Sequence, residues 1–269
     1  MNLQRIYAIF LRQFYLMKSN PSRLASIFLW PIVVIAQWGF ISKYLGSFGK
    51  STFGFITVIL GAIILWEFVS RIQQGIMMGF LEDIWSQNFI NFFASPLKVG
   101  EYLSGLVLTS IITGLLGFVI LVLIAGLAFG YNIFKIGLMI LPFMSVLFLF
   151  GISAGIFVSA LIFRLGPSAE WLGWPIPMVL SVFAGVFYPI STLPMGLQIF
   201  SKLIPASYVF EGIRSILAGT ALSADLLSGF LIGCFLAFAY LFIAYKIFVA
   251  VYRKNLKTGA IARFSAESF

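Results

Sequence analysis

Long apolar segments alternate with short charged segments along the whole chain. Six stretches of at least 16 residues carry no charge, and each is rich in Leu, Ile, Val, Phe and Gly. A charge near the middle of a bilayer costs at least about 2.5 kcal/mol, so uncharged stretches of this length indicate membrane spans of about 20 residues. We expect six transmembrane helices, at residues 24–45, 53–74, 103–128, 136–163, 171–188 and 226–250.

A shorter amphipathic pattern precedes the first span. Apolar residues recur there at three- and four-residue spacing, at Leu3, Ile6, Phe10, Phe14 and Met17. Arg5, Arg12 and Lys18 flank this stripe. The pattern predicts an amphipathic helix within residues 1–23 that lies on the inner membrane face. A cytoplasmic extension of the first span is the alternative, although Pro21 would interrupt such a continuous helix.

The inner segment 75–102 mixes acidic residues with amphipathic aromatic residues. Helical spacing continues to about Ala94, and Ser95 followed by proline ends it. An amphipathic helix parallel to the membrane would suit docking of a cytoplasmic partner, whereas the alternative is a linker on the membrane surface. The candidate docking residues are Glu82, Asp83, Trp85, Phe89, Phe92, Phe93 and Pro96.

The outer segment 189–225 is long yet apolar, which a freely solvated loop would not be. Three prolines divide it into two short pieces, so we expect a re-entrant hairpin of two short helices between the fifth and sixth spans. A seventh span is disfavoured, because the prolines and the charges at 202, 211 and 214 are costly in lipid. The residues expected to shape the hairpin are Pro189, Pro194, Pro205, Tyr208, Glu211 and Arg214, the last two as an i,i+3 pair.

Glu67 is the one acidic residue inside a predicted span, in its inner half. An acid within the membrane is by default a candidate for a proton or substrate site. Arg71 follows at i+4, which is the favourable order for a structural ion pair. Both interpretations of this intramembrane pair stay open.

Composition excludes several classes of protein. The chain is 61% hydrophobic and 9% charged, which rules out an ordinary soluble domain and a disordered chain. There is no histidine and one cysteine, Cys234, so histidine-based sites and an intrachain disulfide are unavailable. No segment supplies a nucleotide-binding loop or a pair of catalytic acids. We therefore expect no enzymatic activity, no metal and no cofactor in this chain itself.

The net charge of +9 reports topology rather than nucleic-acid binding. With six spans and a cytoplasmic N-terminus, 12 basic residues lie inside and 5 lie outside. The positive-inside rule then places both termini in the cytoplasm of a multi-pass protein of the cytoplasmic, or inner, membrane. The expected organisation is an interfacial helix at 1–23, a six-span domain at 24–250 and a basic tail at 251–269, with membrane lipid as a partner.

Two segments resemble the membrane-spanning subunits of type-2 ABC exporters. The inner one reads NFFASPLKVGEYL, and the outer one reads FYPISTLPMGLQIFSKLIPASYVFEGIRSILAG, at residues 187–219. The second carries the family's recurring prolines, with Tyr208, Glu211, Arg214 and Gly219. The basic N-terminal helix and the six spans extend the resemblance over essentially the whole chain.

The resemblance implies a half-transporter that exports a polysaccharide, lipid-linked glycan, lipid or drug. Two permease copies, as a homodimer or alternatively a heterodimer, would pair with two separate ATP-binding subunits that hold ATP and Mg²⁺. The stretch from Glu82 to Phe93 would correspond to the coupling helix that contacts the ATPase. The rival hypothesis is an ATP-independent secondary transporter or channel centred on Glu67, although no inverted repeat relates residues 24–128 to 136–250.

Overall fold

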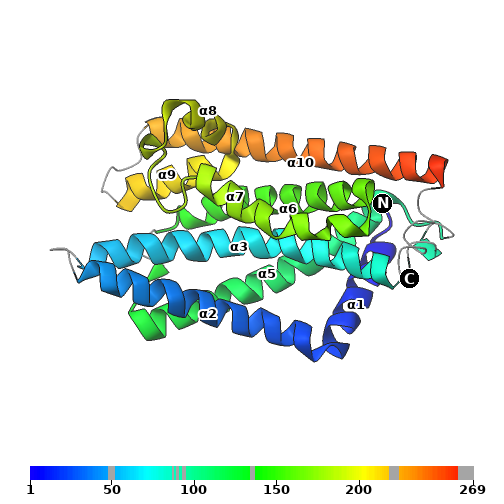
Figure 1. The fold of residues 1–269 in the computed structure, drawn as a ribbon, viewed down its shortest axis with the longest axis horizontal. Coiled ribbons are helices and arrows are strands. Elements are labelled where there is room, and N and C mark those ends of the chain that lie inside the picture. The colour runs from blue at the N-terminus through cyan, green and yellow to red at the C-terminus, as the bar shows by residue number, and fades with distance from the viewer. Residues whose placement is uncertain are drawn as a thin grey trace.

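Five helices of 26–35 residues run along the long axis of the molecule (Figure 1). The structure is a computed structural model that describes residues 1–47, 52–86, 88, 91–92, 95–133, 137–217 and 224–259, and no strand occurs among them. The long helices are α2 (Pro21–Gly46), α3 (Thr52–Trp85), α5 (Val99–Phe129), α6 (Ile140–Leu165) and α10 (Ala224–Thr258). Even the shortest is about 39 Å long, more than the roughly 30 Å of a bilayer core.

Three of these helices are also apolar enough to cross a membrane, judged within the described residues. They are Val99–Phe129, Ile140–Leu165 and Asp225–Thr258. The predicted spans 103–128 and 226–250 lie entirely within two of these helices. Most of the fourth predicted span lies within α6, which begins at Ile140 and not at 136. The predicted spans 24–45 and 53–74 lie within α2 and α3, so the expected helices are present in all five places.

The predicted span 171–188 is not one continuous α-helix. A 3₁₀-helix, η2 (Pro167–Gly173), precedes the nine-residue helix α7 (Pro175–Phe183). Prolines at the start of α7 remove backbone donors that a longer α-helix would need. The chain turns at Gly185, whose φ of 64° is a left-handed conformation that a glycine adopts without strain. The 3₁₀-helix η2 packs against α6, and α7 packs against η2.

Helix α6 lies at the centre of the bundle, packed between α3 and α10. In its most apolar stretch 72% of residues are buried, compared with 22% for α5 and 17% for α10. Gly151 and Gly155 make the approach to α3 possible. A Cβ on Gly151 would lie 3.0 Å from the carbonyl oxygen of Val69, and one on Gly155 would lie 3.0 Å from that of Gln73. A pair of small residues four apart thus sets the contact between these helices.

The amphipathic N-terminal helix is present as α1 (Leu3–Ser19), which crosses one end of the bundle (Figure 1). Asn2 caps it by accepting a hydrogen bond from the backbone N–H of Gln4 at 3.0 Å. The helix ends at Asn20, and α2 then begins at Pro21, three residues before the expected start of the span. Pro21 therefore begins the next helix, where its missing N–H costs nothing.

Two short helices follow the turn at Gly185, at the opposite end of the bundle from α1 (Figure 1). After the short 3₁₀-helix η3 (Ile190–Thr192), they are α8 (Met195–Leu203) and α9 (Pro205–Leu217). Helix α9 belongs to the core, with Val209 and Phe210 buried against α6 and α10. Helix α8 instead exposes Met195, Ile199 and Phe200. Of the expected hairpin, one arm is packed and the other presents an apolar surface.

Candidate functional site

The expected docking helix has different boundaries in the structure. Residues 75–85 belong to α3, which continues without a break to Trp85, and α5 begins at Val99. Ser86 and Asn88 lie in turns, and Asn91 and Phe92 are again helical, while the predicted end near Ala94 lies outside the described residues. Short polar side chains favour this end, because they compete for backbone hydrogen bonds: the Ser86 hydroxyl donates to the Asp83 carbonyl at 3.5 Å. The segment between α3 and α5 is therefore 86–98.

Asp83 does not lie on the surface. Its side chain is fully buried and forms an ion pair with Arg12 of α1. The hydroxyl of Tyr102, on α5, donates to the other carboxylate oxygen at 2.6 Å. One carboxylate thus joins α1, α3 and α5, and it is not available to a partner. Asp83 was predicted to contact a cytoplasmic partner, and its contacts with Arg12 and Tyr102 were not predicted.

A second carboxylate holds the start of α1 against the start of α5. Glu101 is buried and accepts hydrogen bonds from the backbone N–H of Asn2 at 2.7 Å and of Lys98 at 3.0 Å. Arg5 lies 3.5 Å from the same carboxylate and also donates to the carbonyl of Pro96. The only signal in the sequence was the i,i+3 spacing of Lys98 and Glu101, which fits a capping arrangement.

These two clusters form one connected unit, which we call the inner junction. It consists of Asn2, Arg5, Arg12, Asp83, Pro96, Glu101 and Tyr102. Apolar and polar contacts between the helices support it. Ile9 packs over Gly105, where a Cβ would lie 3.2 Å from the Ile6 carbonyl, and the Gln13 amide donates to the Gly79 carbonyl at 3.2 Å. Phe92 links the loop to the junction.

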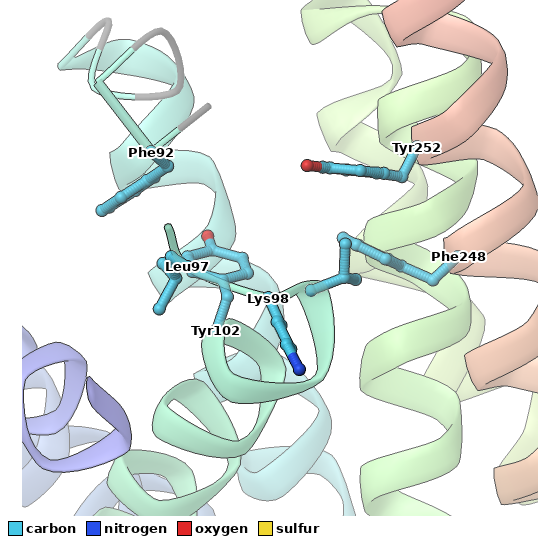
Figure 2. Close-up of a pocket in the computed structure, with 7 residues that line it drawn as sticks. Phe92, Leu97, Lys98, Tyr102, Phe248 and Tyr252 are labelled. Carbon is cyan, nitrogen blue, oxygen red and sulfur yellow. The ribbon is translucent and has the colours of Figure 1, made fainter. Parts of the chain in front are cut away.

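The Phe92 ring lies under the Arg12 guanidinium, 5.3 Å from its centroid, and 5.3 Å from the ring of Tyr102. Figure 2 shows Phe92 above Tyr102, with Phe248 and Tyr252 reaching from α10 toward the start of α5. A cation over an aromatic ring is attractive, so this side of the loop is fixed to the junction. Phe92 is accordingly only half-exposed.

Other predicted docking residues remain accessible. Trp85 is 52% exposed at the last position of α3, and Pro96 is exposed. Glu82 is half-buried beside them. Phe89 and Phe93 lie outside the described residues. The exposed tryptophan and its acidic neighbour are the described side chains best placed to meet a partner at this end of the molecule.

Acid should loosen the inner junction at Glu101. Glu101 lies in the first turn of α5, before the predicted span at 103–128. Hydrogen bonds from the N–H groups of Lys98 and Asn2 hold the pKa of Glu101 below its ordinary value of 4.5. Because the folded state favours the charged form, this stabilisation is complete above pH 4.5 and is lost as the pH falls through the lowered pKa.

We expect amide exchange in α1 to accelerate when the pH is lowered through that range. The measurement is hydrogen–deuterium exchange, corrected for the intrinsic pH dependence of exchange. A Glu101→Gln variant serves as the control, since it should exchange quickly at neutral pH and lose the acid dependence. Equal protection of α1 in the variant and the parent protein at neutral pH would contradict the role of Glu101.

At the other end, the predicted Glu211–Arg214 pair is present on α9, with its atoms 3.1 Å apart. Glu211 also accepts from the Ile190 N–H at 2.8 Å, while Arg214 donates to the carbonyls of Gly185 and Val186. The pair therefore fixes the turn after α7 to the core helix. The remaining hairpin residues occupy starts and ends of helices: Pro189 precedes η3, Pro194 precedes α8, Pro205 begins α9, and the Tyr208 hydroxyl donates to the Lys202 carbonyl at 2.9 Å.

Glu67 and Arg71 lie one turn apart on α3, half-buried, and attract each other electrostatically. The Arg71 guanidinium passes over Gly117 of α5, where a Cβ would lie 2.7 Å from the arginine Cδ. Its Nε and Nη2 atoms are buried and have no hydrogen-bond partner among the residues that the structure describes. The electrostatic attraction fits a structural pair, while the buried donors of Arg71 fit a proton or substrate site. Both interpretations of the pair therefore remain open.

The chain was compared with known proteins. The family model of the ABC-2 type transporter matches residues 4–218, from α1 to the end of α9 and well over half of the 269 residues. No curated protein matches the chain. The matched region includes the inner junction except Asn2, and it includes the Glu211–Arg214 pair. The chain therefore belongs to the ABC-2 type transporter family and is a membrane-embedded permease subunit of an ABC-type transporter.

Proposed function

We propose that this permease exports an amphipathic substrate across the cytoplasmic membrane, driven by a separate ATPase. Candidate substrates are a polysaccharide, a lipid-linked glycan, a lipid or a drug. Permeases of this family are generally paired with an ATP-binding subunit. We propose two copies of each subunit, with ATP and Mg²⁺ held by the ATPase and no enzymatic activity in this chain. We count η2 and α7 as one of six membrane passes, so that both termini lie on one side, and the distribution of basic residues favours the cytoplasmic side.

The inner junction is the observation that carries this proposal. It connects Phe92, Pro96 and Lys98, which lie between α3 and α5, to three helices through ion pairs and hydrogen bonds, so a force on this segment acts on α1, α3 and α5 together. Such a unit can transmit movement because packed cores shift between discrete arrangements instead of deforming continuously. ATP-driven closure of two ATPase subunits would then rock these helices and open a path between the two permease copies.

Reversing charge near the end of α3 should weaken assembly with the ATPase. We expect Glu82→Lys combined with Trp85→Ala to lower the amount of ATP-binding subunit that co-purifies, because aromatic anchors and complementary charges carry most interface energy. Asp83 is left unchanged, since its burial would confound the result. Asp225→Lys, an exposed acid at the other end of the molecule, is the matched control. Unchanged co-purification and transport in the double variant would contradict the docking assignment.

A carrier that works without ATP is the second candidate, and the buried donors of Arg71 beside Glu67 favour it. In that case no ATP-binding subunit would co-purify, and Glu67→Gln would abolish transport without loss of folded protein. A stoichiometric ATPase and transport that survives Glu67→Gln would support the exporter instead. These results separate the two candidates, because the exporter requires an ATP-binding subunit and the carrier requires Glu67.

A further inference from the structure

A long apolar groove runs along the side of the bundle near α1. Its walls are α5 and α10, and its floor is α6, as residues from each of these helices line a cavity of about 650 Å³. The walls include Leu103, Val107, Leu241 and Phe242, and the floor includes Ile152 and Ile156. This volume lies within the range of about 300–1,000 Å³ that is typical of ligand sites.

The length of the groove matches one membrane leaflet. Along α5 it extends from Gly100 to Ile111, which is about 17 Å of helix. Half of a bilayer core is roughly 15 Å. The groove begins at the end of the molecule that holds α1, where the interfacial helix itself contributes Ile6 to its lining. An extended acyl chain of the adjacent leaflet would therefore fit along its length.

Polar and basic groups gather at that same end. Ser104 and Tyr245 are lining residues with hydroxyl groups, and the Tyr245 hydroxyl would lie 3.4 Å from a Cβ on Gly100. The Lys246 ammonium lies 5.2 Å from the centroid of the Phe242 ring, which also lines the groove. Lys98 stands at the start of α5, and its ammonium points along the first turn of that helix (Figure 2). This arrangement places cations above an apolar channel.

Among the described residues, the carboxylate of Glu101 does not cancel this charge. Glu101 is the carboxylate nearest to the start of the groove in sequence, and it is buried with hydrogen bonds from Lys98 and Asn2 and an ion pair to Arg5. Hydroxyl donors and lysines suit a phosphate group, and the channel suits a hydrocarbon chain. A molecule with one anionic end and one long apolar part is complementary to the site as a whole.

We propose that this groove binds an anionic phospholipid of the leaflet around α1, which is the cytoplasmic leaflet under the topology proposed above. One acyl chain lies between α5 and α10, and the phosphate lies near Tyr245, Lys246 and Lys98. The proposal rests on the membrane location of the family and holds whether or not the protein is an ATP-driven exporter.

Photo-crosslinking tests this site directly. The full chain, with any subunit that co-purifies, is reconstituted in phosphatidylcholine nanodiscs that contain a trace of photoreactive lipid. The probes are phosphatidylglycerol and phosphatidylcholine with the same diazirine-bearing acyl chain, and labelled peptides are mapped by mass spectrometry. We expect phosphatidylglycerol to label residues 99–111 and 238–245 more than phosphatidylcholine does. Equal labelling by both probes in the parent protein would overturn the proposal without any variant.

Paired variants then locate the two parts of the lipid. Lys246→Gln should lower phosphatidylglycerol labelling about fivefold, the loss expected for one lysine near an anionic surface, while the exposed Lys254→Gln should not. Val107→Trp should block the channel, while Leu116→Trp, at an exposed position of α5 outside the lining, should leave labelling unchanged. Labelling that survives Val107→Trp, crosslinks from the groove to a second copy of the chain, or displacement of the probe by a transported substrate would each overturn the assignment.

Discussion

Asp83→Ala is expected to destabilise the protein by about 3–5 kcal/mol. Removal of one partner of a buried ion pair leaves the other charge uncompensated, which costs more than the pair contributes. Here the loss would strand Arg12 and also the Tyr102 hydroxyl, whose bond to Asp83 is 2.6 Å long. The measurement is the folded, monodisperse fraction after stepwise heating in mild detergent. Asp225→Ala, at an exposed acid on α10, is the control and should stay within about 0.5 kcal/mol.

A second set of variants separates charge from packing at the same site. Replacing all three polar partners by apolar ones, as Arg12→Met with Asp83→Leu and Tyr102→Phe, should recover much of the lost stability. Transport should nevertheless remain impaired if the junction also transmits force from the loop. Full recovery of both stability and transport would show that the junction is purely structural. An Asp83→Ala protein as stable as the parent would contradict the burial of this carboxylate.

The sequence predicts the helices better than it predicts their ends. Charge-free stretches predict the part of a helix that lies in lipid, and they do not predict where the helix ends. Helix α3 continues to Trp85, well beyond the expected end of its span at 74. The reason is that residues 75–85 pack against other helices, and Ile76, Met77 and Phe80 are fully buried. An amphipathic pattern beyond a span does not distinguish a helix on the membrane surface from a span that extends out of the membrane.

Local pairs were predictable, whereas long-range pairs were not. Glu211 and Arg214 lie three residues apart, and helical geometry alone brings them together. Asp83 and Arg12 are separated by 71 residues, and only the docking of α1 across α3 and α5 joins them. An acid near a predicted loop was therefore interpreted as a docking residue although it is a core residue. The charge of Arg12 was likewise assigned to the membrane surface.

The spacing of small residues can suggest a close contact between helices, but it does not show where that contact lies. Gly151 and Gly155 form a small-residue pair, and such pairs are frequent in membrane helices. The same pattern occurs at Ser181 and Gly185, yet there Gly185 has a φ of 64° and turns the chain after α7. The sequence offers the two pairs equally, and only the structure separates a packing face from a turn.

Gly155→Leu is expected to be the most disruptive substitution in the membrane-embedded core. A Cβ at this position would lie 2.9 Å from the Cβ of Ile76 and 3.0 Å from the Gln73 carbonyl. The second neighbour is backbone, so it cannot move aside as the end of a flexible side chain can. Helices α6 and α3 would have to separate, and overpacking of this kind costs about 3 kcal/mol.

The matched control is Gly196→Leu on α8, where a new Cβ would meet no atom within 4 Å. We expect Gly155→Leu to lose most of its folded fraction at a temperature that the Gly196→Leu protein withstands, as measured by size-exclusion chromatography after heating. Because α6 touches both α3 and α10, the damage should reach the inner junction and increase amide exchange in α1 as well. Normal stability of Gly155→Leu would mean that α3 and α6 are farther apart than described. Movement at the segment between α3 and α5 could then not reach α6 through this contact.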